Sequence, residues 1–133
     1  MATMLAHMTV RPGKETEWEA VMRALTLETF RREAGVIRYE FWKGAAERSY
    51  YGLLAFKDKF AYYEHQMSAA FQQVDLEDLL EELRVEHVGP VEGAGGGLPP
   101  TNDPPLPEDA GEALRDVQAR YPLRIPEWWS GRL

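Results

Sequence analysis

The segment GVIRYEFWKGAAERSYYGLLAF, residues 35–56, indicates the fold most directly. Residues 36–42 alternate, so Ile37, Tyr39 and Phe41 are expected on one face of a strand and their neighbours on the other. Residues 49–56 form a second run of aromatic and apolar side chains, which is typical of a strand. The residues between the two runs have the length of a hairpin loop, so we predict two antiparallel strands.

A helix and a strand are predicted before this hairpin. Residues 15–34 contain neither Gly nor Pro, and apolar side chains such as Trp18 and Met22 recur at helical spacing. Gly35 ends this helix. The apolar run at 4–10 is followed by a Pro-Gly pair, which predicts a strand and then a turn.

The same pattern of helix and strand follows the hairpin. Residues 57–67 are expected to form a helix, Ser68 to cap a second helical piece over 69–83, and residues 84–91 to form the last strand. The order is therefore βαββαβ. This order predicts an α+β, ferredoxin-like fold, in which an antiparallel four-stranded sheet carries its helices on one face.

The division of the chain follows from composition. Residues 1–91 form the predicted domain, and 92–107 are a Gly- and Pro-rich linker. Residues 108–133 are predicted to hold a short helix and a tail with Trp128 and Trp129, a C-terminal arm that docks on its own body or on a partner. A sheet with one uncovered face and a thin core also predicts a homodimer that packs sheet against sheet.

Charge and cysteine content narrow the function. The 133 residues carry a net charge of −7 and no cysteine. Nucleic-acid binding needs clustered Lys and Arg, so no nucleic-acid partner is expected, and disulfides and Cys-based zinc sites are excluded. The N-terminus lacks a basic region, its apolar run breaks at His7, and no apolar window is long enough to span a membrane. We expect a cytoplasmic protein.

Three features of residues 3–91 resemble the antibiotic biosynthesis monooxygenase domain, a dimeric α+β barrel. The first is the strand with a Pro-Gly turn before the first helix. The second is Glu33 with Gly35 and the Arg-Tyr-Glu run at 38–40. The third is the spacing of Ala61, His65, Ser68 and Phe71. The resemblance implies an oxygenase of aromatic quinols or phenols that uses no cofactor and no metal.

The chain also departs from the family pattern. Ala70 stands where the family often has a second His, and the third strand lacks the Glu that often occurs late in it. The resemblance to the family also allows its haem-degrading branch to be tested, whose site has an Asn, a Trp and an iron-binding His. In this chain the corresponding positions are near Ala6, His65 and Asp75, and none of these residues matches the branch. Haem degradation is therefore not expected, and the substrate is left open.

His65 is the candidate catalytic residue, as a base or a hydrogen-bond donor to a phenolic substrate. The alternative is that His65 only binds a backbone carbonyl or a neighbouring subunit. A set of aromatic and apolar side chains is expected to line the substrate pocket, although the same side chains could be ordinary core. They are Tyr63, Tyr51, Trp18, Tyr39, Met22 and Met67.

Two further hypotheses stay open at this level. His7 and His87 fall on strands that the topology makes neighbours, so they could lie side by side, although a metal site there is disfavoured. As alternatives to a monooxygenase, the domain could be a non-catalytic small-ligand-binding or structural dimer, or could use the same pocket for a tautomerase-like reaction.

Overall fold

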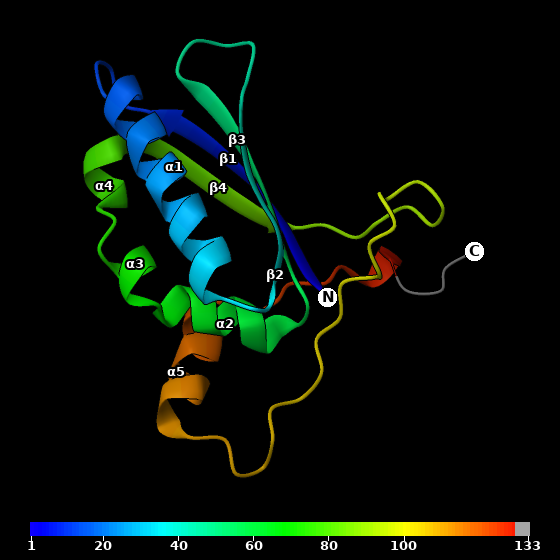
Figure 1. Ribbon diagram of the computed structural model, residues 1–133. Helices are drawn as coiled ribbons and strands as arrows, with labels where there is room; N and C mark the ends of the chain where they lie inside the picture. Colours follow the sequence, from blue (N-terminus) through cyan, green and yellow to red (C-terminus); the bar gives the residue numbers. More distant parts are fainter. Residues whose placement is uncertain (130–133) are drawn as a thin grey trace.

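The computed structural model describes residues 1–129, which form one antiparallel sheet with helices against it (Figure 1). The strands lie in the order β2-β3-β1-β4. Their bounds are Ala2–Val10 for β1, Val36–Lys43 for β2, Ser49–Phe56 for β3 and Leu80–His87 for β4. The helices are α1 Glu15–Arg32, α2 Lys59–Met67, α3 Ala69–Gln72, α4 Leu76–Leu79, α5 Glu112–Arg120 and the 3-10 turn η1 Glu127–Trp129.

The predicted βαββαβ order and ferredoxin-like arrangement are confirmed. Helices α1 and α2 lie on the same side of the sheet (Figure 1). Alternate residues of β1, from Ala2 through Met4 to Val10, are buried on that inner face. The other residues of β1 lie on the outer face, where His7 pairs with Tyr51 of β3. No helix within residues 1–129 is long and apolar enough to cross a membrane.

The long helix predicted over residues 69–83 is wrong. Ser68 caps α3 as expected, since its Oγ accepts a hydrogen bond from the Phe71 N–H at 3.2 Å. The helix then stops, and Asp75 caps a new four-residue turn, α4. From Leu80 the chain is already strand β4, four residues earlier than predicted. The leucines of this segment have helical spacing, which favoured a helix in the prediction. In the structure residues 80–83 pair with β1 instead and are therefore a strand.

The alternation predicted for the second strand fails at its start. Val36 pairs with Phe56 and Arg38 with Ala55, so Ile37 is an extra residue in a β-bulge. Val36 therefore packs against the core, and Ile37 is 45% exposed instead of facing inward. Beyond the bulge, Tyr39 and Phe41 face the helices as predicted.

Gly35 brings the end of α1 close to α2. A Cβ atom at this position would lie 2.5 Å from the Ala61 Cβ, so only glycine permits the approach. The Lys57 N–H donates to the Gly35 carbonyl at 2.8 Å, and Asp58 caps α2 through the Ala61 N–H at 2.9 Å. These contacts hold Gly35 against the start of α2.

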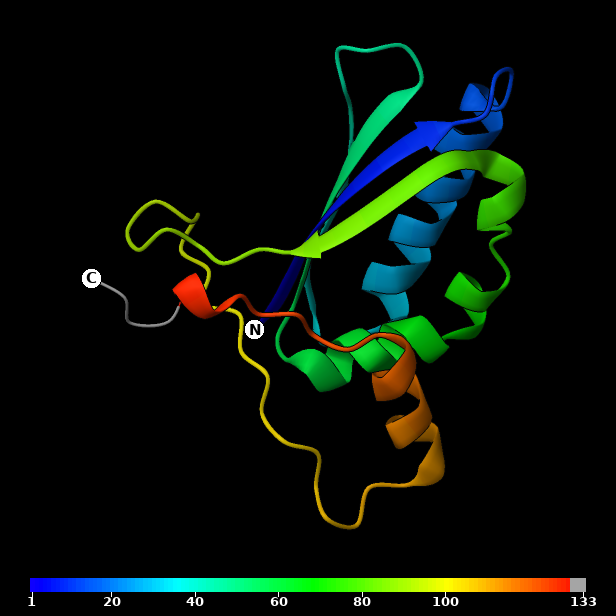
Figure 2. The ribbon, with the colours of Figure 1, turned by 180° about the vertical axis from the view of Figure 1, so that it is seen from behind.

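The C-terminal arm, from Val88 to Trp129, returns to the body of its own chain. Helix α5 packs beneath α2, and the chain then runs back toward the end of β4 (Figure 2). Val117 is buried and Leu114 packs on the core, and the predicted short helix is present as α5. Trp129 packs on Gly89, while Trp128 is 71% exposed. The segment boundaries at residues 91 and 107 stay predictions, and the last four residues of the predicted tail lie outside the described residues.

Candidate functional site

A cavity of about 340 Å³ lies between the helices and the inner face of the sheet, and we call it the helix–sheet cavity. All four strands contribute apolar or aromatic side chains to its wall, together with Trp18 and Met22 of α1. Few of the lining residues carry polar side-chain groups, and they include Tyr39, Tyr62 and Gln66. An apolar cavity of this size with a few polar groups suits a small ligand.

Three side chains from three elements form a buried hydrogen-bonded chain at one wall of this cavity. The Tyr39 hydroxyl lies 3.0 Å from Nε2 of His65. Nδ1 of His65 lies 3.0 Å and 3.1 Å from the two carboxylate oxygens of Glu33. We call these residues the Tyr-His-Glu relay. His65 is 1% exposed, Tyr39 4% and Glu33 9%.

The carboxylate of Glu33 fixes the direction of the hydrogen bond at Nδ1 of His65. A carboxylate only accepts, so Nδ1 of His65 carries a proton and donates it to Glu33. When only Nδ1 carries a proton, Nε2 accepts and the Tyr39 hydroxyl donates to it, whereas an imidazolium donates from both nitrogens. Burial raises the pKa of Tyr39 above its usual value, and the nearby Glu33 charge adds to this. Tyr39 is therefore held as a neutral phenol, although a hydrogen bond with the Thr29 side chain acts on its pKa in the opposite direction.

The surroundings of His65 are apolar. Its ring lies 5.4 Å from that of Phe56 and 5.3 Å from that of Phe71, measured between centroids, and the Tyr39 ring lies at 5.0 Å. Among residues 1–129, the hydrogen bonds of the imidazole ring are those to Tyr39 and Glu33. An interior of low dielectric strengthens these bonds.

The relay connects the helix–sheet cavity to the outside of the protein. Tyr39 lines the cavity, whereas Glu33 lines a surface pocket of about 640 Å³ at the ends of α1 and α2. His65 lies between them and lines neither space. A proton taken up at Tyr39 therefore has a hydrogen-bonded route to the surface pocket.

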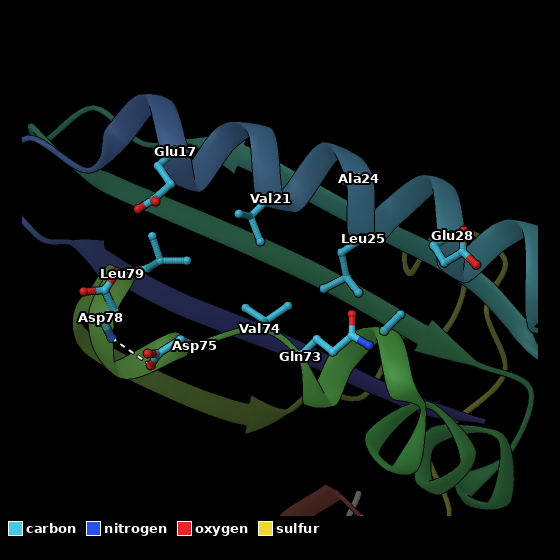
Figure 3. Close-up of a pocket in the computed structure, with 11 residues that line it drawn as sticks. Glu17, Val21, Ala24, Leu25, Glu28, Gln73, Val74, Asp75, Asp78 and Leu79 are labelled. Atoms are coloured by element: carbon cyan, nitrogen blue, oxygen red, sulfur yellow. Dashed lines mark hydrogen bonds between the residues drawn. The ribbon is translucent and has the colours of Figure 1, made fainter.

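Two openings on the surface share walls with the helix–sheet cavity. A cleft of about 320 Å³ between α1 and the β2–β3 hairpin shares Trp18, Met22 and Tyr39 with it. A groove of about 460 Å³ runs between α1 and the segment from Ala70 to Leu79, with Leu25 at its floor (Figure 3). Leu25 also lines the cavity. The groove carries acidic side chains along its rim, which disfavours an anionic ligand.

The structure brings only some of the predicted pocket residues together. Trp18, Met22 and Tyr39 line the helix–sheet cavity. Tyr51 is 40% exposed on the outer face of the sheet, and Met67 lines the surface pocket instead. Tyr63 is fully buried, and burial, followed by the charge of Asp103, raises its pKa to about 12. Of these last three side chains, none lines the cavity among the described residues.

His7 and His87 do not form a pair. Strands β1 and β4 are neighbours as expected, but His7 pairs with Arg84 and His87 pairs with Met4. These positions lie on opposite faces of the sheet, so the expectation that the two imidazoles lie side by side is wrong. Within residues 1–129, no group of three His, Asp or Glu side chains is placed to hold a metal ion.

Glu33, Gln66, Tyr62 and Tyr121 are site residues that sequence reasoning did not assign. Glu33 appeared only as part of the family resemblance, because it lies 32 positions from His65 and on another element. Tyr62 and Gln66 are one residue away from the Tyr63 and Met67 that were chosen. Helical spacing allows either set, and the rotation of α2 about its axis decides between them.

The fold defines a small α+β protein, and comparison with known proteins identifies its family. A family model described as antibiotic biosynthesis monooxygenase matches residues 1–75. No curated protein matches the chain. The chain belongs to the antibiotic biosynthesis monooxygenase family.

Three solved structures illustrate the similarity. SO0527 from Shewanella oneidensis is 31% identical, with 65% of this chain and 87% of that chain covered at a TM-score of 0.59. PA3566 from Pseudomonas aeruginosa is 26% identical, with 65% and 90% covered at a TM-score of 0.60. Rv0793 from Mycobacterium tuberculosis is 20% identical, with 68% and 94% covered at a TM-score of 0.61, and its likeness shows the fold alone.

Proposed function

We propose that this protein is a cofactor-independent monooxygenase that acts on a small aromatic phenol or quinol. The observation that carries the proposal is the Tyr-His-Glu relay, which joins an apolar cavity to the protein surface through a buried imidazole. Membership of the family supports the reaction class. The aromatic substrate is inferred from the walls of the cavity.

The first step is removal of the phenolic proton. The substrate hydroxyl donates to the Tyr39 oxygen, and Tyr39 passes its own proton to Nε2 of His65. The Glu33 carboxylate stabilises the imidazolium that results, and it accepts the Nδ1 proton at the surface pocket. General base catalysis of this kind contributes a rate factor of about 100 to 10,000.

The second step is the reaction of the phenolate with dioxygen. The electron-rich ring transfers an electron to dioxygen, and the two radicals combine to form a C–O bond at the carbon para to the hydroxyl. Loss of water from this adduct gives a quinone. For 1-naphthol the balance is naphthol plus dioxygen to 1,4-naphthoquinone plus water. The substrate supplies all four electrons, so the reaction needs no external reductant.

The helix–sheet cavity supports this chemistry in two ways. Its apolar walls, including Trp18 and Met22, exclude water from the reactive anion. The hydroxyl of Tyr62 and the amide of Gln66 offer fixed dipoles to the oxygen atoms of the substrate. Fixed dipoles in a cavity without bulk water need no reorganisation during the reaction.

The proposed assembly is a homodimer in which two sheets pack face to face. The outer face of the sheet carries Trp42, which is 59% exposed, and Tyr51, which is 40% exposed. Large aromatic side chains gathered on an uncovered face are typical of a protein interface. Within residues 1–129, the helices that pack on the sheet lie on the other face (Figure 1).

Oxygen uptake tests the proposed function. The protein is dialysed against a chelator and mixed with 1-naphthol and 9-anthrol in an oxygen electrode, with no cofactor added. We expect uptake with the native chain and a fall of at least about 100-fold in His65→Ala and Tyr39→Phe. Glu64→Gln is the matched control, because Glu64 is exposed on the same helix. Tight binding of both phenols without any uptake would favour the non-catalytic ligand-binding dimer.

A further inference from the structure

The C-terminal arm contributes a wall to the helix–sheet cavity. Tyr121, just after α5, lines the cavity although it lies more than 30 residues beyond the end of β4. The family match ends at residue 75, so this wall belongs to a part of the chain outside the matched region. The arm therefore adds something of its own to the site.

Specific contacts hold the arm in place. The side chain of Lys59 on α2 is 2% exposed, and its ammonium group lies 2.6 Å from the Asp103 carboxylate and 2.8 Å from the Gln118 amide oxygen. A buried ammonium needs such partners, so the arm and α2 are tied to one another. The Arg124 N–H also donates to Nδ1 of His87 on β4 at 3.2 Å. Tyr121 lies between these two attachments along the chain.

Tyr39 of the relay and Tyr121 line the cavity from the sides of different edge strands. Tyr39 comes from β2, which is one edge strand of the sheet. The Tyr121 ring lies 6.4 Å from that of Tyr62, which in turn lies 6.4 Å from that of His87 on β4, the other edge strand. Three strand spacings separate the backbones of these edge strands by about 14 Å. A ligand whose hydroxyl meets Tyr39 therefore extends toward Tyr121.

We infer that Tyr121 sets the length of the ligand that the cavity accepts. The inference rests on the proposed function for one point, the placement of the phenolic hydroxyl at Tyr39. The limit on ligand length follows from the position of the Tyr121 ring in the wall of the cavity. The arm acts as a fixed end wall, and the class of ligand is a flat phenol that ends before Tyr121.

Two phenols that differ by one linearly fused ring test this inference. They are 1-naphthol and 1-hydroxyanthracene, and their dissociation constants are measured by calorimetry without oxygen turnover. The full-length variants are Tyr121→Ala and Tyr121→Trp. The first has a smaller side chain and leaves a longer cavity, and the second has a larger side chain and leaves a shorter one. Tyr121→Phe keeps the ring, and Asp116→Ala is the control for a change on the exposed side of α5.

The native chain is expected to bind 1-naphthol about tenfold more tightly than 1-hydroxyanthracene. Tyr121→Ala should reduce this preference about tenfold by strengthening binding of the longer phenol, and Tyr121→Trp should weaken both. A gain of binding cannot come from misfolding. Tyr121→Phe and Asp116→Ala should keep the native preference.

Failure of the inference and failure of the proposed function give different results. An unchanged preference in both Tyr121→Ala and Tyr121→Trp overturns the role of Tyr121, whatever the oxygen electrode shows. A shifted preference without oxygen uptake supports the end wall and counts against the monooxygenase. If the native chain binds neither phenol, both proposals are overturned.

Discussion

Replacement of Glu33 by Gln tests the relay at its outer end. Both carboxylate oxygens of Glu33 lie within 3.1 Å of Nδ1 of His65, and aromatic rings surround the imidazole. The substitution keeps the size of the side chain and removes its charge. The neutral imidazole keeps a hydrogen bond to the amide oxygen. The imidazolium formed during the reaction loses its counter-ion.

The size of the effect follows from this geometry. Opposite charges 3.0 Å apart attract by about 5 kcal/mol at an effective dielectric constant of about 20. The amide oxygen of Gln restores about 1–2 kcal/mol through its hydrogen bond. The remaining loss of about 3–4 kcal/mol corresponds to a fall in kcat of about 100- to 1,000-fold.

The assay is initial oxygen uptake at saturating 1-naphthol, with the native chain and Glu33→Gln compared at equal concentration. Glu64→Gln removes the same charge from an exposed position beside His65 and should keep native kcat. Urea unfolding of each variant checks that the fold is intact. A folded Glu33→Gln protein with kcat within about threefold of the native value would refute the role given to the carboxylate.

Three further substitutions test the structure around the site. Asp103→Ala leaves the buried Lys59 with one polar partner and should lower the free energy of unfolding by about 2–3 kcal/mol, as measured by urea denaturation. Burial, followed by the nearby Arg124 charge, lowers the pKa of His87 in the folded state. The unfolded chain therefore takes up this proton first, and stability should fall as pH drops below about 6.5, less steeply in His87→Asn. Gly35→Ala places a methyl group 2.5 Å from the Ala61 Cβ on α2. This clash should lower the free energy of unfolding by about 1–3 kcal/mol, which is measured as a lower Tm.

The sequence predicts the sheet well because alternation and turn residues are local signals. Residues 49–56 are a strand in both prediction and structure. The bulge at Ile37 was missed, since an extra residue is visible only when the partner strand is known. Residues 80–83 were assigned to a helix because the spacing of their leucines fits both a helix and a strand. The pairing with β1 makes this segment a strand, and that pairing is not visible in the sequence.

The candidate site was predicted less completely because it depends on contacts between distant elements. His65 could be selected from its place in one helix, but its partner Glu33 is brought near only by the close approach at Gly35. Tyr51 was chosen over Tyr50, although Tyr50 shares its face with Leu54 and Tyr51 does not. The contribution of Tyr121 depends on how the arm folds back, which no local pattern encodes.

The most direct test of the central claim is the fate of labelled dioxygen. The chelator-treated protein is incubated with 1-naphthol under ¹⁸O₂, and the quinone is reduced at once to its hydroquinone and analysed by mass spectrometry. The account predicts one labelled oxygen atom per product molecule, with product formation at least about 100-fold slower in Tyr39→Phe. Unlabelled product, or equal rates in the native and Tyr39→Phe proteins, would contradict it.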